Sequence, residues 1–377
     1  MSAFHQTYRI EARSVFDSLV KNQETTYAAY AHHLSRACWH GSRIVLRQTS
    51  LEAEGIFDFI IELHRACNGR WDDFLNLGIG QEELNTWLDF AGMFLSSLGN
   101  YFGDGDRKVI PDISEDTLHK LGSISPGANG KLKNILHPML SAQPAIMGYL
   151  DDNCQSSYYL GTEQVTRAEI DAIKKIMHAN KVAPENTRLR KYTCDTSSVF
   201  DKGYIFEILQ ASAEKDPEPQ LLGYIRIGNH CPSRIFLKRG DYAAEMANIS
   251  AETTEARKYA TTEEQKTALS HLIESFNTGM YQAFRSAQEI WVKDKAPLVE
   301  HCMGFLFGYR DPYGARAEWQ GAVGIAHSEE TTKTRQLVCR IPEFMRTFPW
   351  AIPNDNDGKG PFEPSEPDLP DFTIIHR

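Results

Sequence analysis

The first half of the chain carries apolar residues at steps of three and four, the spacing that places them on one face of a helix. One such stripe runs from Tyr27 to Leu46, and further helices are predicted from about Leu51 to Ala66 and from about Gln81 to Leu98. Between about Ser114 and Asn180 the pattern predicts shorter helices, which are broken at Pro126–Gly127, at Pro138 and at the turn Asp151–Asn153. This half is therefore expected to be mainly helical.

The pattern changes after Thr187, where short apolar runs alternate with turn signals. Successive short runs with tight connections predict a small antiparallel sheet or barrel. The predicted strands lie around Leu189–Thr193, Tyr204–Leu209, Leu221–Ile227 and Arg234–Leu237.

A single apolar stripe from Leu269 to Trp291 then predicts one long helix. A further helix is expected to begin near Pro297. After Ile341 the composition changes again, because seven Pro lie between Pro342 and Pro370 among Asp, Asn and Glu. This composition is typical of a linker or a disordered tail.

These patterns divide the chain into four parts. We expect a helical part at residues 1–186, the small sheet or barrel at 187–242, a long helix with the segment that follows it at 243–341, and a Pro-rich tail at 342–377.

Composition and charge exclude several classes of function. The chain has 377 residues and a net charge of -10, and no block of Lys and Arg stands out, so nucleic-acid binding is not expected. No apolar run is long enough to span a bilayer, and the polar N-terminus lacks the apolar core of a secretory signal. The seven widely spaced Cys include no CxxC pair, which favours free thiols. A cytoplasmic location is the expectation.

A search for catalytic and metal-binding motifs gives no candidate. None of the 13 His has the spacing of a zinc-hydrolase helix, in which two His lie one turn apart with a Glu beside the first. His33 and His40 share a helix face but lie two turns apart. Gly-rich phosphate loops and a G-x-S-x-G segment are also missing. We therefore assign no catalytic residue, metal ligand or cofactor to the chain from its motifs.

Two neighbouring segments resemble the dipeptidyl peptidase III family of zinc exopeptidases. These are WVKDKAPLVE (Trp291–Glu300) and FGYRDPYGARAEWQG (Phe307–Gly321). Similar matches occur in order along the chain, at AAYAHHLSRACWHGSRIVLRQTSLEAEGIFDFI (Ala28–Ile60), LGNYFGDGDRKVIP (Leu98–Pro111), Glu185–Arg188 and Arg239–Tyr242. The resemblance covers nearly the whole chain.

The resemblance implies a fold of two lobes around a wide cleft. One lobe combines helices with a five-stranded barrel, and the other is mostly helical and carries the zinc. The chain resembles the first lobe, so we expect an α+β fold, a helix-rich lobe with a small antiparallel five-stranded β-barrel or sheet. The family binds zinc through a helical His-Glu-x-x-Gly-His motif and a later Glu, neither of which occurs here. The chain stops at Arg377, about where the family's chain enters its catalytic lobe.

The resemblance also implies a set of substrate-binding residues. Tyr309 matches a cleft Tyr of the family, and Phe307 and Gln320 stand where the family has Glu residues that help to hold the substrate's ammonium group. Losing those charges would weaken an ammonium site by about a few kcal/mol. Asp104 stands where the family's cleft loop has Phe. The expected substrate-binding residues are Asn100, Tyr101, Asp104, Gly105, Asp106, Phe307, Tyr309, Arg310 and Gln320.

Two main hypotheses for the function follow. In the first, the chain is equivalent to the substrate-binding lobe of a zinc dipeptidyl peptidase that removes N-terminal dipeptides, and by itself holds no zinc and hydrolyses no peptide. In the second, it is a repurposed, metal-free protein whose less acidic cleft wall binds an uncharged small molecule or a protein partner. A third interpretation is a scaffold with an apolar lobe face exposed for a partner.

Overall fold

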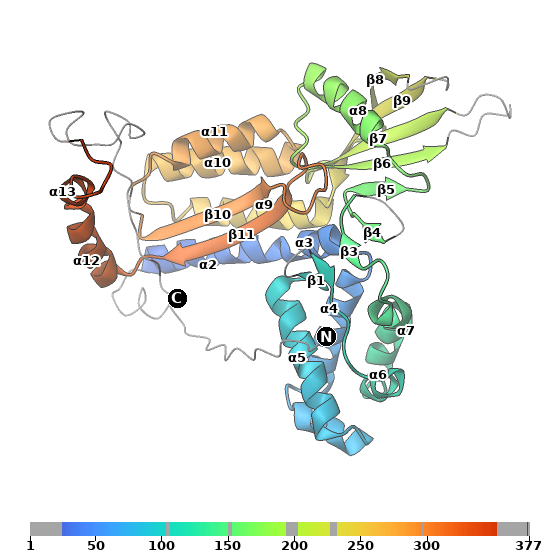
Figure 1. The fold of residues 1–377 in the computed structure, drawn as a ribbon. Coiled ribbons are helices and arrows are strands. Elements are labelled where there is room, and N and C mark those ends of the chain that lie inside the picture. Colours follow the sequence, from blue (N-terminus) through green and yellow to red (C-terminus); the bar gives the residue numbers. More distant parts are fainter. Residues whose placement is uncertain are drawn as a thin grey trace.

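The structure is a computed structural model that describes residues 25–102, 106–149, 153–193, 203–226, 232–295, 297–352 and 375. Three hydrophobic cores organise these residues. In Figure 1 the first core occupies the centre, the second lies below it, and the third lies at the upper right.

The first core lies between a layer of helices and a two-stranded antiparallel sheet. Its helices are α2 (Thr25–His40), α9 (Ala243–Arg257), α10 (Glu263–Thr278) and α11 (Tyr281–Trp291), and its strands are β10 (Val299–Phe307) and β11 (Glu318–Ile325). Alternate residues of β10, Val299, Met303 and Phe305, are buried against the helices. This period of two is what a sheet with one buried face requires.

The second core is entirely helical. It is formed by α3 (Ser42–Thr49), α4 (Ala53–Ala66), η1 (Trp71–Leu77), α5 (Gln81–Ser97), α6 (Glu115–Gly122) and α7 (Pro126–Leu140). Helix α3 joins the first two cores, because Ile44 is buried in the first and Leu46 in the second.

The third core lies between helix α8 (Arg167–Ala179) and a five-stranded sheet. The strands, in spatial order, are β5 (Tyr159–Gly161), β6 (Thr187–Thr193), β7 (Tyr204–Ala211), β9 (Ser233–Asp241) and β8 (Gln220–Ile225). The β5–β6 and β7–β9 pairs are parallel, and the β6–β7 and β8–β9 pairs are antiparallel.

These elements confirm the predicted α+β class. The prediction of an antiparallel five-stranded sheet or barrel is wrong in one respect, because the sheet is mixed, and in the described residues it is open between β5 and β8. Strand β5, which was not predicted, supplies one parallel edge. Strands β7 and β9 form the second parallel pair. The chain passes from β7 to the edge strand β8 and then returns to β9, which lies between β7 and β8.

Two predicted helices are each divided in two. The stripe from Tyr27 to Leu46 is broken at Gly41, between α2 and α3, and the stripe from Leu269 to Trp291 is broken at Gly279 and Met280. Gly279 adopts a left-handed conformation with φ 78°, which ends α10. Apolar residues continue on the same face across both breaks, so periodicity alone could not show them.

Three further differences concern Pro138, the segment near Pro297 and the segment after Tyr101. Pro138 lies inside α7 and does not end it. The helix expected near Pro297 is strand β10. The region around the second core also contains a small sheet of two-residue strands: β1 (Tyr101–Phe102), β2 (Arg107–Lys108), β3 (Ile146–Met147) and β4 (Cys154–Gln155).

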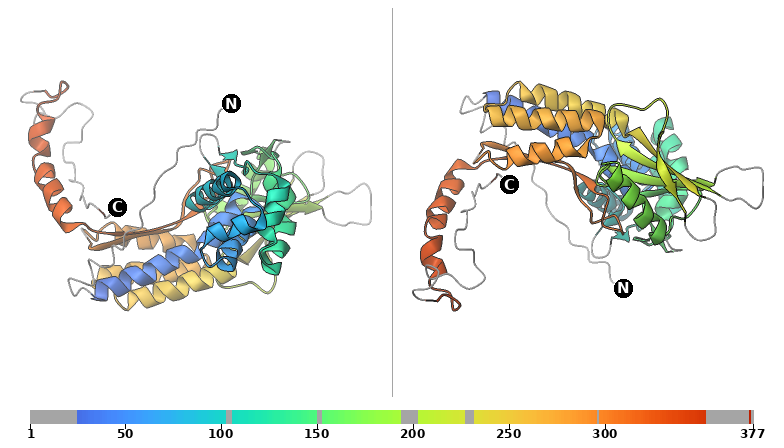
Figure 2. Two further views of the ribbon diagram at one scale, coloured as in Figure 1. Left: turned by 90° about the horizontal axis from the view of Figure 1, so that it is seen from below. Right: turned by 90° about the horizontal axis from the view of Figure 1, so that it is seen from above.

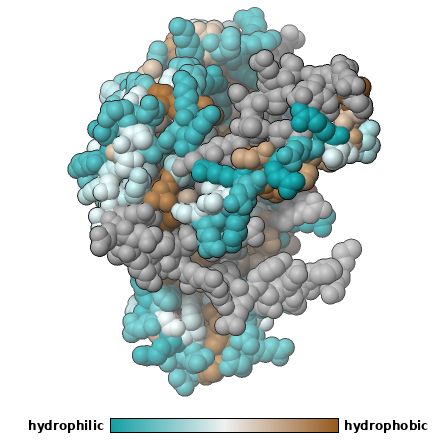
Figure 3. Space-filling view, turned by 90° about the vertical axis from the view of Figure 1, so that its left-hand side faces the viewer, coloured by the Kyte–Doolittle hydropathy of each residue, from teal (hydrophilic) through white to brown (hydrophobic). Residues whose placement is uncertain are grey.

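Helices α12 (Ser328–Val338) and α13 (Ile341–Met345) project from the end of the β10–β11 sheet, as both views of Figure 2 show. Several apolar side chains near them are exposed, namely Leu337, Phe344, Phe348 and Trp350. Among the coloured residues in Figure 3, hydrophilic ones predominate and the hydrophobic ones form separate patches.

The predicted tail falls mainly outside the described residues. Residues 342–352 of it are described, and they include most of α13. Further along, Ile375 is described and forms an antiparallel bridge with Ala326. None of the helices in the described ranges combines the length and the apolar character that a bilayer span needs. The five cysteines in these ranges are free, as expected, and Cys194 and Cys231 lie outside them.

The junction between α2 and α3 depends on a close contact with Trp319 of β11. A Cβ atom added at Gly41 would lie 1.8 Å from the Trp319 indole Nε1 atom. The indole is 2 % exposed and packs against Phe276 and Phe305. The absence of a side chain at Gly41 therefore leaves room for the indole, and β11 can pack against the helices.

We predict that Gly41→Ala lowers the free energy of unfolding by about 1–3 kcal/mol, because the added methyl group displaces a buried indole. Urea denaturation would measure this change. The matched control is Gly92→Ala in the middle of α5, where an added Cβ meets nothing within 4 Å. In this control the free energy of unfolding is expected to rise by about 0.5–1 kcal/mol. Equal stability of Gly41→Ala and wild type would contradict the packing argument.

Candidate functional site

The C-terminal end of α3 and the residue after it join three separate chain segments through side-chain hydrogen bonds. The amide of Gln48 bonds twice to the start of β11: its Nε2 donates to the carbonyl of Ala317 (3.1 Å), and its Oε1 accepts from the N–H of Trp319 (2.8 Å). Gln48 is 2 % exposed. Both halves of a buried amide are thus satisfied by backbone groups, which fixes β11 relative to α3.

Thr49 connects the same helix end to Arg310. Its hydroxyl donates to the carbonyl of Val45 (2.9 Å) and accepts from Nη1 of Arg310 (2.7 Å). The carbonyl of Thr49 accepts a hydrogen bond from the amide of Gln155 (2.7 Å). The Nε of Arg310 pairs with the Glu318 carboxylate at 3.1 Å. Thr49 therefore fixes the guanidinium that faces Glu318.

Ser50 connects the helix end to the segment around Asn100. Its hydroxyl donates to Oδ1 of Asn100 (2.8 Å), and Nδ2 of Asn100 donates to Oε1 of Glu52 (2.9 Å). Lys108 pairs with the same Glu52 oxygen at 2.9 Å. The Asn100 side chain is buried, so it acts as a structural link and is not a surface that a ligand meets.

Tyr101 and Asp106 lie on the two sides of the predicted cleft loop. Tyr101 is buried, and its hydroxyl donates to the carbonyl of Pro144 (2.6 Å). Burial raises its pKa above the ordinary value for tyrosine. Asp106 adopts a left-handed conformation with φ 44°, and its carbonyl accepts the N–H of Met147 (3.0 Å). The negative charge of Asp106 acts on Glu318, which places the two carboxyl groups in one electrostatic environment.

Glu318 is the carboxylate at the centre of this group. Burial raises its pKa above the ordinary value for glutamate, and repulsion from Asp106 raises it further. The Arg310 guanidinium and a hydrogen bond with the Gln320 side chain act in the opposite direction. The site thus holds two carboxylates and one guanidinium, and a cation placed there would be favoured electrostatically.

An exposed aromatic pair stands beside Glu318. The rings of Phe307 and Tyr309 are stacked, with their centroids 5.5 Å apart. Their exposed fractions are 44 % and 78 %, so both rings offer a face to solvent. Phe307 is paired with Glu318 across the sheet, next to an irregularity between Phe305 and Phe307. Gln320 lies on the outward side of β11, opposite Gly304.

The turn after Arg310 is held by Asp311. One carboxylate oxygen of Asp311 accepts from the hydroxyl of Tyr159 (2.8 Å), and the other accepts the N–H groups of Ala315 (2.9 Å) and Arg316 (2.8 Å). The Arg316 guanidinium donates to the hydroxyl of Tyr159 (3.2 Å), whereas Glu318 pairs with Arg310. This turn fixes the direction in which the chain leaves Arg310.

The structure thus brings two predicted segments together. Asn100, Tyr101 and Asp106 from one segment and Phe307, Tyr309, Arg310 and Gln320 from the other lie around the end of α3. Asp104 and Gly105 lie outside the described residues. The search for motifs missed Gln48, Thr49, Ser50 and Glu318 as members of the site. A signal was present, since four consecutive polar residues, Arg47–Ser50, end an otherwise amphipathic helix.

A zinc ion has no ligand set among these residues. In the described ranges, no three His, Cys, Asp or Glu side chains lie together in a way that could hold a metal ion. The described residues therefore do not form a zinc site.

A family model and curated relatives are similar to this chain. The model of Peptidase family M49 matches residues 131–377. Dipeptidyl peptidase 3 of Dictyostelium discoideum is 32% identical over 98% of this chain and 49% of its own length. The enzyme of the same name from Mus musculus is 29% identical over 93% of this chain and 47% of its own length. The solved structure of DPP III from Caldithrix abyssi matches with a TM-score of 0.48 and 13% identity, over 87% of this chain and 44% of that one.

The chain spans about half the length of the curated relatives that it matches. Its similarity to them extends from the helical N-terminal part through the hairpin that carries Tyr309 and Glu318. Since the family model covers well over half of its residues, the chain belongs to Peptidase family M49.

Proposed function

We propose that this chain provides the peptide-binding surface of a dipeptidyl peptidase III-type zinc peptidase, an enzyme that removes N-terminal dipeptides. The group around the end of α3 holds the free amino end of the peptide. These 377 residues bind the peptide without holding the hydrolytic zinc, because they contain no His-Glu-x-x-Gly-His segment.

One observation carries the proposal: two segments about 200 residues apart in sequence meet at α3. Arg310 donates to Thr49 and Asn100 accepts from Ser50, so the hairpin and the 98–108 segment are fixed by adjacent residues. Buried, fully paired polar groups of this kind hold neighbouring side chains within narrow limits. The arrangement is a preorganised support for the more exposed Asp106, Phe307 and Tyr309.

The charges of the group suit an ammonium ion. Asp106 and Glu318 carry two negative charges against the single positive charge of Arg310, which leaves one negative charge uncompensated. A hydrogen bond between charged partners contributes about 1.5–3 kcal/mol. Because Phe307 and Gln320 replace two expected carboxylates, we infer that the amino end is held mainly by Asp106, with Glu318 in support.

The aromatic pair suits the side chain that follows the amino end. Phe307 and Tyr309 stack on each other and leave their remaining surface exposed. An apolar side chain placed on such a surface is favoured at about 25 cal/mol per Å² of buried area. The proposed site therefore combines one charged anchor with one apolar contact.

We predict that the purified 377-residue chain holds no stoichiometric zinc and releases no dipeptide from a chromogenic dipeptidyl substrate. The reason is that the sequence contains no His-Glu-x-x-Gly-His segment. Elemental analysis and a peptidase assay would check both statements. About one zinc per chain, or hydrolysis that a chelator abolishes, would contradict the proposed division of roles.

We predict that the chain binds tetra-alanine with a free amino end about tenfold more tightly than N-acetylated tetra-alanine. The difference corresponds to about 1.4 kcal/mol, the low end for one charge-assisted hydrogen bond. Isothermal titration calorimetry would measure both affinities. Asp106→Asn should remove most of the difference.

The control variant is Asp89→Asn, which changes an exposed carboxylate on α5 by the same chemistry. It should bind both peptides as the wild type does. Equal affinities of the two peptides for the wild type would contradict the anchoring of an amino end.

The exposed aromatic pair also favours a second candidate function, in which the cleft wall binds an uncharged small molecule. Under this alternative the pair supplies the main contact, the Tyr309 hydroxyl supplies one hydrogen bond, and the chain works without a metal. The replacement of two expected glutamates by Phe307 and Gln320 is consistent with it. The two functions predict opposite effects of an added negative charge at the site. It would strengthen binding of a peptide's ammonium group and weaken binding of an uncharged molecule.

We predict that Phe307→Glu changes the melting temperature by no more than about 2 °C, because Phe307 is 44 % exposed. The substitution should weaken the binding of an uncharged aromatic probe such as indole by about one to three kcal/mol, since it places a carboxylate beside the ligand. The same change should strengthen binding of the free-amine peptide. Phe307→Leu, which keeps the apolar character, is the control. A melting temperature lowered by many degrees would show that Phe307 is part of the core.

A further inference from the structure

Helix α8 covers one face of the five-stranded sheet, and the other face is the starting point here. Leu189, Ile208 and Ile235 point towards α8 and belong to the third core, beside which the helix lies in Figure 1. Successive side chains of a strand point to opposite faces of the sheet. The residues next to these three in sequence therefore point away from α8, to the surface that we call the open face.

The register of the strands arranges the open face in two rows of side chains that cross from β6 through β7 and β9 to β8. The first row is Arg190, Glu207, Phe236 and Leu221. The second row is Tyr192, Ile205, Arg234 and Tyr224. Opposite side chains on neighbouring strands lie about 5 Å apart. Each row is thus a continuous line of side chains, about 15 Å long across four strands.

The β8 end of both rows is apolar and open to solvent. Tyr224 is 60 % exposed and Leu221 is 43 % exposed. Phe236 lies opposite Leu221 on β9 and is half-buried. Large apolar side chains that adjoin one another at the surface are typical of an interaction site.

The charged side chains of the open face are mainly cationic. Glu207 is the one carboxylate of the two rows, and it pairs with Arg190 (3.2 Å) and accepts from the Tyr192 hydroxyl (3.3 Å). The guanidinium of Arg234 lies over the Phe236 ring, 5.9 Å from its centroid. Lys238, the next residue of β9 on this face, is exposed and has no ion pair within the described ranges.

This cationic surface belongs to an acidic chain, whose net charge is -10. With Arg190 neutralised by Glu207, the charges of Arg234 and Lys238 remain on the open face. A patch whose sign is opposite to that of the whole protein selects its partner by charge, because acidic surfaces are repelled elsewhere. The apolar side chains beside the cations require a partner that is apolar as well as acidic.

We propose that the open face binds an acidic segment of a partner protein that also carries aromatic or other large apolar side chains. The carboxylates of the segment pair with Arg234 and Lys238. Its apolar side chains pack on Leu221, Tyr224 and Phe236. The contact uses side chains of the sheet face, and the backbone ladder of the sheet stays as it is.

A protein segment suits the open face better than a nucleic acid does. A nucleic acid carries one negative charge per nucleotide, and each of these charges is repelled by the acidic chain. A short acidic segment brings few charges and places them at the cations. Leu221 and Ile205 also offer aliphatic surface, whereas single-stranded nucleic acids are bound by stacking of their bases on aromatic rings.

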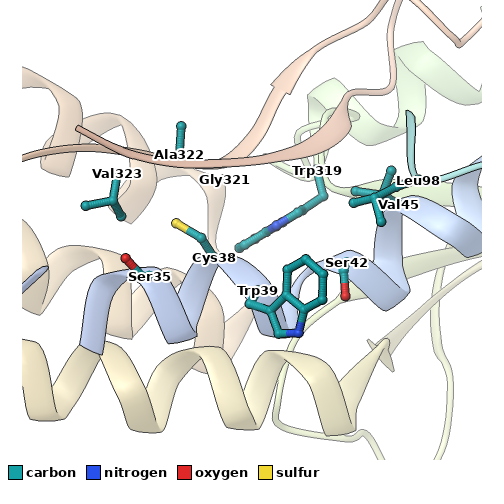
Figure 4. Close-up of a pocket in the computed structure, with 10 residues that line it drawn as sticks. All are labelled: Ser35, Cys38, Trp39, Ser42, Val45, Leu98, Trp319, Gly321, Ala322 and Val323. Carbon is teal, nitrogen blue, oxygen red and sulfur yellow. The ribbon is translucent and has the colours of Figure 1, made fainter. Parts of the chain in front are cut away.

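The open face is distinct from two other surfaces of the chain. The site proposed for a peptide's amino end depends on the negative charges of Asp106 and Glu318, which would repel an acidic segment. The pocket in Figure 4, of about 300 Å³, lies between β11 and helices α2 and α3, and none of its lining residues is charged. An acidic peptide without a free amino end is therefore a selective probe of the open face.

The probe is the capped hexapeptide acetyl-Asp-Phe-Asp-Leu-Asp-Phe-amide, and the reference is the same peptide with Asn in place of each Asp. Isothermal titration calorimetry at low ionic strength would measure both affinities for the full chain. We expect the acidic peptide to bind about tenfold more tightly, the combined effect of two exposed ion pairs, and added salt to reduce the difference. Equal affinities of the two peptides at low ionic strength would overturn the proposal.

Two substitutions at exposed positions test the two parts of the contact. Lys238→Glu replaces an attraction by a repulsion, and Tyr224→Ser removes apolar surface. We expect each to weaken the acidic peptide about fivefold. Circular dichroism would show that both variants keep the fold.

The matched control is Lys133→Glu, which makes the same change of charge at an exposed position of α7. It should leave the affinity within about twofold of the wild type, since the charge lies outside the open face. Equal weakening by Lys133→Glu and Lys238→Glu would show a general charge effect and overturn the proposal. Asp106→Asn, which tests the amino-end site, should not weaken the acidic peptide, so the two proposals can fail separately.

A single-stranded oligouridylate tests the other class of acidic ligand. We expect it to bind more weakly than the acidic peptide. Tighter binding of the oligouridylate, lost in Lys238→Glu, would assign the open face to nucleic acid and overturn the proposal.

Discussion

The Gln48 amide determines where the elements of the site lie. A buried primary amide must find both donors and acceptors, and Gln48 finds them on two backbone groups of one strand. A shift of β11 by one residue would leave both unsatisfied and would turn Trp319 out of the space above Gly41. The register of β11, the helix break at Gly41 and the packing of the Trp319 indole thus depend on one another. Together they determine where Arg310, Glu318 and Gln320 lie.

The site lies where the hydrophobic cores of the molecule meet. Helix α3 contributes Ile44 to the first core and Leu46 to the second, and strand β7 contributes Ala211 to the first core and Ile208 to the third. A ligand held between the 98–108 segment and the hairpin therefore contacts elements that belong to different cores. The free energy of ligand binding therefore depends on how rigidly these elements are held relative to one another. The hydrogen bonds of Thr49 and Ser50 hold them in place.

Sequence periodicity predicted the parts of the fold that depend on local burial. The helices near Leu51 and Gln81 and the strands near Leu189 and Tyr204 have the positions expected from it. The breaks at Gly41 and Gly279 were missed because they depend on distant groups: the indole of Trp319, and the Asn186 and Gln210 amides that donate to the Gly279 carbonyl. Parallel pairing in the sheet and strand β10 were missed for a related reason. Pairing partners far apart in sequence leave no local trace, and the resemblance, not the pattern, brought Tyr309 and Asn100 into one candidate site.

The buried pair of Lys108 and Glu52 has an evolutionary consequence. Their side chains are 3% and 10% exposed, and Asn100 shares the same carboxylate oxygen. Removing one partner of a buried pair leaves the other charge uncompensated, which costs about 3–5 kcal/mol. Selection would therefore remove single substitutions at either position. The two residues can change only together, or after another mutation has stabilised the fold. Lys108 and Glu52 should covary among relatives, while exposed positions without such a partner, such as Asp89, are free to change one at a time.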